Sequence, residues 1–152
     1  MRIAALDVGS RRIGIALSDP LGYTAQPDHV MERRGTRADV ASLLAFCAER
    51  GVTELVLGLP LELDGTEAQR ARRVRVLFDA LVSLFAGPVH LWDERLTTVA
   101  AERVMLEADL SRRRRKQSID MVAAALILQG FLDHRRLQAA RELEPGAPLG
   151  ED

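Results

Sequence analysis

The sequence lacks the features that mark secreted and membrane proteins. Its 152 residues include one cysteine, Cys47, so no disulfide can form within the chain, which fits a reducing compartment. No apolar run approaches the ~20 residues that cross a bilayer, and the N-terminus lacks the apolar core and cleavage site of a signal peptide. We therefore expect a cytoplasmic protein that has no membrane partner.

Aromatic residues and net charge are also scarce. Aromatic residues make up 4% of the chain, so we expect an aliphatic core and few rings to stack on nucleic-acid bases. The net charge of −1 does not mark a nucleic-acid-binding protein, although acidic residues elsewhere can hide a local basic patch. The length is sufficient for one domain with a sizeable core.

Apolar segments separated by turn-forming residues predict an α/β domain. The predicted strands are residues 2–8, 12–18, 24–33, 54–58 and 89–92, and the predicted helices are residues 37–50, 97–107, 118–138 and one within 64–85. Gly9 and Ser10 separate the first two strands, which should form an antiparallel hairpin. Pro27 places the third strand at an edge.

The order of these elements predicts how the sheet is built. Hairpin-connected strands come first, and strands that alternate with helices, as in parallel crossovers, follow. We expect a mixed five-stranded sheet, three antiparallel strands plus two parallel, flanked by helices. The domain should span residues 1–138, and the segment 139–152, with its prolines, glycines and acids, is expected to be a disordered tail.

Three acidic residues in distant segments are candidates for chemistry. Asp7 ends an apolar strand, where a charge is costly to bury without compensation, although an Asp before a tight turn can simply bond to its own backbone. Glu94 follows the strand 89–92, where a surface loop before a capped helix is the simpler reading. Asp120 lies at the margin of an apolar helical face, one turn after Lys116, so an ion pair with Lys116 is the alternative.

The three acids converge if the strands run parallel. Strands 2–8 and 89–92 would then present Asp7 and Glu94 at the edge where α/β sheets bind ligands. Carboxylate oxygens are the donors that Mg²⁺ and Mn²⁺ prefer. Two such ions about 4 Å apart can activate water and stabilise the leaving oxygen of a phosphodiester. No cysteine and histidine spacing suits zinc.

Four stretches of the chain resemble the signature motifs of the YqgF family, also called RuvX. They read ALDVGSRRIGIALSD, GLPLELDGTE, DERLTT and KQSIDMVAAALIL, and they occur in the family's order up to about Asp133. The resemblance implies a ribonuclease H-like fold and a metal-dependent nuclease in which Asp7, Glu94 and Asp120 hold Mg²⁺ or Mn²⁺.

The resemblance leaves the substrate open. The family is described both as a nuclease for the 5′ end of pre-16S rRNA, in ribosome biogenesis, and as a Holliday junction resolvase. We take rRNA processing as the first hypothesis and junction resolution as the alternative. One position departs from the family pattern, because Glu62 replaces its usual asparagine. Glu62 is either an auxiliary acid near the metal or a solvated loop residue.

Basic residues near the acids are candidates for phosphate contact, which predicts binding that weakens with salt. The run SRRRRKQ, expected between two helices, provides most of them. Arg95 can clamp a phosphate or pair with Asp93, and the hydroxyls of Thr97 and Thr98 can touch substrate or cap a helix. The full set is Arg11, Arg12, Arg95, Thr97, Thr98, Arg112, Arg113, Arg114, Arg115 and Lys116.

Two other classes of function compete with the nuclease. The first motif also resembles the phosphate-binding hairpin of actin-like ATPases and sugar kinases, but those need a second such domain, for which this chain is short. A non-catalytic nucleic-acid-binding factor is the other rival, and the three retained acids argue against it. A resolvase predicts a two-fold homodimer, whereas a monomer suffices for RNA trimming.

Overall fold

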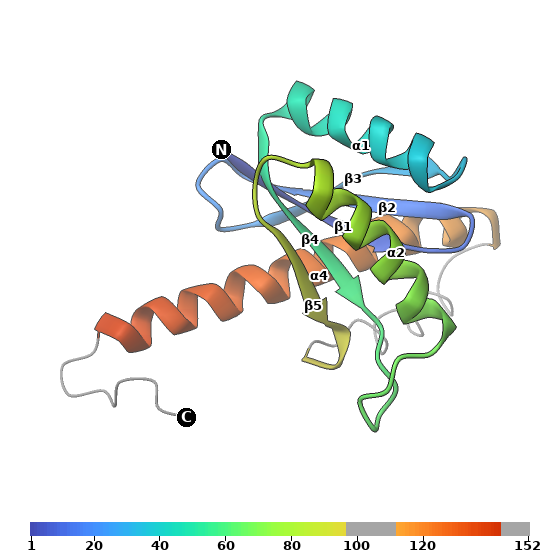
Figure 1. Cartoon of the computed structure of the whole chain (residues 1–152). Coiled ribbons are helices and arrows are strands. Elements are labelled where there is room, and N and C mark those ends of the chain that lie inside the picture. Colours follow the sequence, from blue (N-terminus) through green and yellow to red (C-terminus); the bar gives the residue numbers. More distant parts are fainter. Residues whose placement is uncertain (97–111, 144–152) are drawn as a thin grey trace.

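One mixed β-sheet with helices on both faces forms the structure (Figure 1). The computed structural model describes residues 1–96 and 112–143, with side chains from residue 119 onward in the second range. The strands are β1 (Arg2–Val8), β2 (Arg12–Ser18), β3 (Ala25–Glu32), β4 (Val52–Leu59) and β5 (Val89–Asp93). The helices are α1 (Thr36–Arg50), α2 (Gln69–Leu84), the short 3₁₀ helix η1 (Glu94–Leu96) and α4 (Arg112–Leu143).

The sheet has the predicted topology. Its strand order is β3-β2-β1-β4-β5, with β3 at an edge as Pro27 predicts. β1 pairs antiparallel with β2, and β2 pairs antiparallel with β3. β1 pairs parallel with β4, and β4 pairs parallel with β5. The prediction of three antiparallel and two parallel strands is therefore confirmed.

The sheet separates two hydrophobic cores. Successive residues of a strand point to opposite faces, so Leu6 packs toward α1 and α2 while Ala5 packs toward α4. Because β1 lies in the middle, both of its faces are buried, which explains its continuous apolar sequence. Cys47 is buried in the first core, and burial raises the pKa of its thiol to about 11.

The last helix is longer than predicted at both ends. It begins at Arg112, so the basic run lies in its first turns and not between two helices as expected. Arginine and lysine favour helix, and no glycine or proline interrupts the segment, so charge alone does not stop the helix there. The helix ends at Leu143, so the expected boundary after residue 138 falls within it. The predicted helix 97–107 and residues 144–152 of the expected tail lie outside the described residues.

The far end of α4 extends beyond the sheet (Figure 1). Residues 133–143 are all exposed. Within this exposed stretch, Arg135 bonds to Glu54 on β4, which also contacts His90 on β5. The hydrogen bond from Arg135 lowers the pKa of Glu54. This cluster attaches α4 to β4 and β5 near the start of β4, whereas Asp7 lies near the end of β1. Within the described residues, no helix is long and apolar enough to span a bilayer.

A buried ion pair holds the turn between β1 and β2. Asp39 on α1 is 1% exposed and accepts hydrogen bonds from the Arg33 side chain at 3.0 Å and the Arg34 backbone N–H at 2.9 Å. Arg33 also donates to the carbonyl of Gly9 at 3.1 Å. The pair therefore ties α1 to the turn that follows Asp7. Sequence analysis did not identify this pair.

Removing Asp39 should cost much of the stability of the domain. We expect Asp39→Ala to lower the free energy of unfolding by about 3–5 kcal/mol, because Arg33 would keep a buried charge without its partner. Urea unfolding measures the change. Arg136→Ala, which removes one side of the exposed pair with Asp133, is the control and should cost about 1 kcal/mol or less. A loss below about 1 kcal/mol in Asp39→Ala would contradict this role.

Candidate active site

Asp7 lies near the end of the central strand, on the face that α4 covers. The residues beside it on both neighbouring strands are glycines. Gly14 on β2 is its direct partner, and the parallel register that pairs Leu6 with Leu57 places Gly58 of β4 on its other side. Asp7 is only 7% exposed. The carboxylate thus stands between two positions without side chains, which leaves space around it for other groups.

Gly14 allows α4 to approach the sheet at Asp120. A Cβ atom at Gly14 would lie 2.0 Å from the backbone oxygen of Asp120 and 3.0 Å from its Cβ. No larger residue fits under this helix without displacing it. Since Gly14 is the cross-strand partner of Asp7, this contact seats Asp120 over the strand next to Asp7, and neighbouring strands lie about 5 Å apart.

Gly58 likewise leaves space for the side chain of Glu94. A Cβ atom at Gly58 would lie 3.1 Å from Oε2 of Glu94 and 2.4 Å from Cδ1 of Ile127 on α4. Glu94 begins η1, directly after β5, and β5 runs parallel to β4 and β1. The structure therefore confirms the parallel arrangement on which the expected convergence depended. It places Asp7, Glu94 and Asp120 around one end of β1 and β4.

Arg12 contributes a positive charge to the same place. It precedes Gly14 by two residues on β2, and its Nε lies 3.3 Å from Oδ2 of Asp120. The two side chains are 28% and 27% exposed, although Nε of Arg12 itself is buried. The Nε–H of Arg12 makes no hydrogen bond within the described residues, so the contact is an ion pair without hydrogen-bond geometry.

The donor atoms suit a hard divalent cation. Three carboxylates from β1, η1 and α4 provide oxygens, and Mg²⁺ and Mn²⁺ prefer oxygen ligands. Among the described residues, no three acidic, histidine or cysteine side chains form a ready-made metal-binding group. The residues fit such an ion in the chemistry of their oxygen donors, and closing around it would require side-chain movement.

Arg95 connects the end of β5 to the loop after β4. Its guanidinium donates to Asp93 at 2.7 Å and approaches the backbone oxygens of Glu62 and Leu63 at 3.5 and 3.4 Å. The hydrogen bond from Arg95 lowers the pKa of Asp93. Of the two roles expected for Arg95, the structure shows the pair with Asp93, and a phosphate contact stays a prediction. The Glu62 side chain is exposed on this loop.

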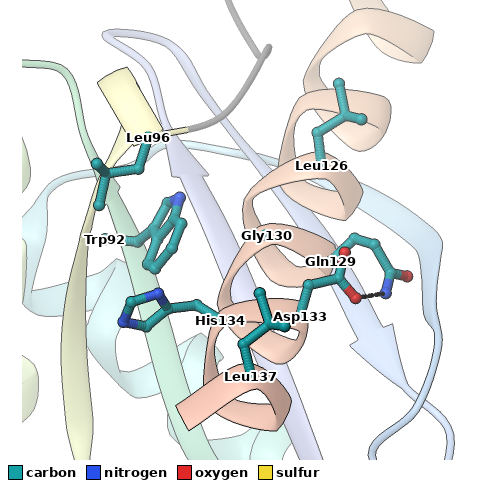
Figure 2. A pocket seen from close by; sticks show the side chains of 8 residues that line it. All are labelled: Trp92, Leu96, Leu126, Gln129, Gly130, Asp133, His134 and Leu137. Carbon is teal, nitrogen blue, oxygen red and sulfur yellow. Dashed lines mark hydrogen bonds between the residues drawn. The ribbon is translucent and has the colours of Figure 1, made fainter. Parts of the chain in front are cut away.

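A groove of about 490 Å³ lies beside the candidate site, on the same side of the sheet (Figure 2). Trp92 and Leu96 line it from the strand side, and α4 residues from Leu126 to Leu137 line the rest. His134 packs against the ring of Trp92 with centroids 5.6 Å apart. Gln129 bonds to Asp133 and to β3, so its amide is already engaged. The groove is mostly apolar, and its one acid among the lining residues, Asp133, is bonded to Gln129.

The remaining predicted residues are placed as follows. Arg11 is exposed in the turn between β1 and β2. Residues Arg112–Lys116 lie in the first turns of α4, before Asp120 in the same helix. Thr97 and Thr98 lie outside the described residues. The structure thus gathers the acids and Arg12 at one end of the sheet.

Comparisons with known proteins identify the family of the chain. Residues 1–134 match the RuvX family, described as Holliday junction resolvase. The chain belongs to the RuvX family. A relative from Moorella thermoacetica, named "Putative pre-16S rRNA nuclease", is 56% identical over 133 residues, which cover 88% of this chain and 95% of the relative. A relative of the same name from Myxococcus xanthus is 51% identical and covers 90% of both chains.

Solved structures of more distant sequence share the fold of this chain. The RuvC protein of Thermus thermophilus, in complex with a Holliday junction substrate, aligns with a TM-score of 0.58 at 13% identity, covering 90% of this chain and 96% of RuvC. The fowlpox virus Holliday junction resolvase aligns with a TM-score of 0.51 at 12% identity, covering 88% and 99%. The expected ribonuclease H-like fold of this RuvX chain is confirmed.

Sequence analysis missed the two glycines that shape the site. Gly14 and Gly58 both interrupt apolar strands, and a glycine inside a strand often marks a close approach of another backbone or ligand. That signal was present in the motifs quoted above. The identity of the approaching groups, Asp120 and Glu94, was not readable from it.

The two glycines should differ in how well they tolerate a methyl group. Gly14→Ala should lower the free energy of unfolding by about 1–3 kcal/mol, because the new Cβ meets backbone of α4. Gly58→Ala should cost less than Gly14→Ala, because the atoms nearest its new Cβ are side-chain atoms of Ile127 and Glu94 and not backbone. Urea unfolding of both variants makes the comparison. Equal losses of unfolding free energy, or a larger loss in Gly58→Ala, would contradict the close packing of the α4 backbone on Gly14.

Proposed function

We propose that this RuvX chain is a divalent-metal-dependent nuclease that processes the 5′ end of pre-16S rRNA in the cytoplasm. One observation carries the proposal. A buried aspartate on the central strand stands between two glycines, and those glycines seat the segments that carry Glu94 and Asp120. Family membership and the names of the relatives, which are about half identical to this chain, support the reaction and the substrate.

Each acid has a distinct position in this proposal. Asp7 is fixed by the sheet and is the least exposed of the three, so it is the inner ligand. Glu94 and Asp120 approach from η1 and α4, one from each side of Asp7. When bound, Mg²⁺ or Mn²⁺ supplies an activated water and compensates the charge that develops on the phosphate. The same ion would offset the cost of burying Asp7.

Basic residues next to the acids would hold the nucleic acid. Residues 112–116 precede Asp120 by one to two helical turns, which is about 6–12 Å along the axis. Arg11 and Arg12 lie at the start of β2, at the same end of the sheet. Phosphate contacts of this kind release counterions, so binding should weaken as salt rises. With few aromatic residues available, we infer recognition of backbone and shape more than of bases.

Holliday junction resolution is the second candidate. The description of the family and the structural similarity to RuvC favour it. Cutting two strands symmetrically needs two active sites and hence a two-fold homodimer, whereas a monomer can trim RNA. The oligomeric state in solution therefore bears on the choice of substrate.

Replacing Asp7 should abolish cleavage without unfolding the chain. We expect Asp7→Asn to reduce metal-dependent cleavage by a factor of about 100 or more, because the inner ligand loses its charge. Cleavage of a pre-16S 5′ fragment, a single-stranded RNA and a four-way DNA junction, each with Mg²⁺ or Mn²⁺, measures the effect.

Circular dichroism of Asp7→Asn provides the control for folding. Preference for the rRNA fragment supports processing, and preference for the junction supports the alternative. Equal cleavage by wild type and Asp7→Asn would contradict the assignment of the acids. Salt-dependent binding with cleavage of no substrate would favour a non-catalytic binding factor.

Glu62 should be dispensable for catalysis. Its side chain is exposed, and Arg95 contacts this loop through backbone oxygens, which any residue provides. Glu62→Asn should therefore keep the cleavage rate within about twofold of wild type, measured on the preferred substrate at two metal concentrations. A rate that falls only at low metal concentration would instead show that Glu62 acts as an auxiliary acid.

A further inference from the structure

The position of Arg12 indicates a role beyond substrate binding, because its side chain contacts one of the candidate acids. It lies on the same face of β2 as Gly14, beneath the start of α4, and its Nε approaches Asp120 to 3.3 Å. Asp120 is one of the acids assigned above to the metal. A positive side chain thus contacts a carboxylate that a divalent cation would also use.

We propose that Arg12 is the counter-ion of Asp120 in the metal-free protein, so that Arg12 and the divalent cation compete for this carboxylate. The inference rests on the proposed metal role of Asp120. Two features favour a contact that can be exchanged. The Nε–H of Arg12 is not directed at an acceptor within the described residues, so the pair is held by charge. Nε itself is buried without an acceptor in the described part of the chain, which is a costly arrangement that movement of Arg12 would relieve, and both side chains are more than a quarter exposed overall.

Exchange would give Arg12 a second role in the loaded site. A guanidinium released from Asp120 stays within reach of the acids, and its fork of donors matches a phosphate. Phosphate contact by Arg12 and cation binding at Asp120 would then favour one another, because each removes a competitor of the other. Such coupling is reciprocal by thermodynamic necessity. Arg12 would therefore link metal loading to substrate binding.

Metal affinity, measured without nucleic acid, tests the competition directly. Titration calorimetry with Mn²⁺ should show Arg12→Gln binding about three- to tenfold more tightly than wild type, since a nearby positive charge is gone. Arg11→Gln removes the same charge one position earlier, in the exposed turn, and should stay within about twofold of wild type. Arg12→Lys keeps the positive charge on a shorter side chain, so its Mn²⁺ affinity should lie between those of wild type and Arg12→Gln.

A double-mutant cycle separates competition from general charge effects. In an Asp120→Asn background, Arg12→Gln should change Mn²⁺ affinity by less than about twofold, because the shared carboxylate is absent. Circular dichroism checks that each variant is folded. If Arg12→Gln does not fold, the comparison of Arg12→Lys with Arg11→Lys replaces it, and tighter binding is again expected only at position 12.

The outcomes distinguish this inference from the proposed function. Equal or weaker Mn²⁺ binding by Arg12→Gln overturns the competition and leaves the nuclease proposal standing. A gain that persists in the Asp120→Asn background also overturns it, because the effect would then not pass through Asp120. Absence of Mn²⁺ binding in wild type and in every variant overturns the metal-dependent function, and the inference with it.

Discussion

The close packing of α4 on β2 at Gly14 is the constraint on which the candidate site depends. The backbone of Asp120 lies where a side chain at Gly14 would be, so the helix is fixed at the cross-strand partner of Asp7. From that seat, the apolar face of α4, including Ala124 and Ile127, fills the second core. The position of Asp120 is therefore set by the same contact that closes the hydrophobic core on this face of the sheet.

Arginine side chains organise the loops around this contact. Arg33 ties the turn after Asp7 to a buried aspartate on α1, and Arg95 ties the end of β5 to the loop after β4. Arg12 contacts an acid of the site itself. A guanidinium can bond to carboxylates and to backbone oxygens at once, which suits it to junctions between segments. Positive side chains therefore lie in the segments around the acids, and the net charge of the chain does not show this local arrangement.

Positive charge near the acids affects the chemistry that they can support. An acidic cluster on a sheet repels itself unless cations are near, and a divalent cation and an arginine both meet that need. The sheet holds Asp7 in place, while Glu94 and Asp120 come from a short 3₁₀ helix and from a helix margin. The candidate site therefore combines one acid held by the sheet with two that come from other elements. This suits a reaction in which charge on a phosphate changes along the path.

The sequence by itself determined the class of fold and supplied three acids as candidates for the site. Apolar segments between turn-forming residues and the order of elements predicted the mixed sheet, and four motifs marked the RuvX family up to about Asp133. It did not determine the length of α4, because a run of arginines reads as a linker although arginine favours helix. The tertiary structure decided which groups meet. Asp120 packs on Gly14, and Glu94 approaches Gly58. Arg12, Arg33 and Arg95 also contact other segments of the chain. Each of these contacts joins segments that only the fold brings together. Periodicity records which face a residue occupies, but which residue lies opposite depends on strand register and helix placement, and packing of the whole domain fixes both.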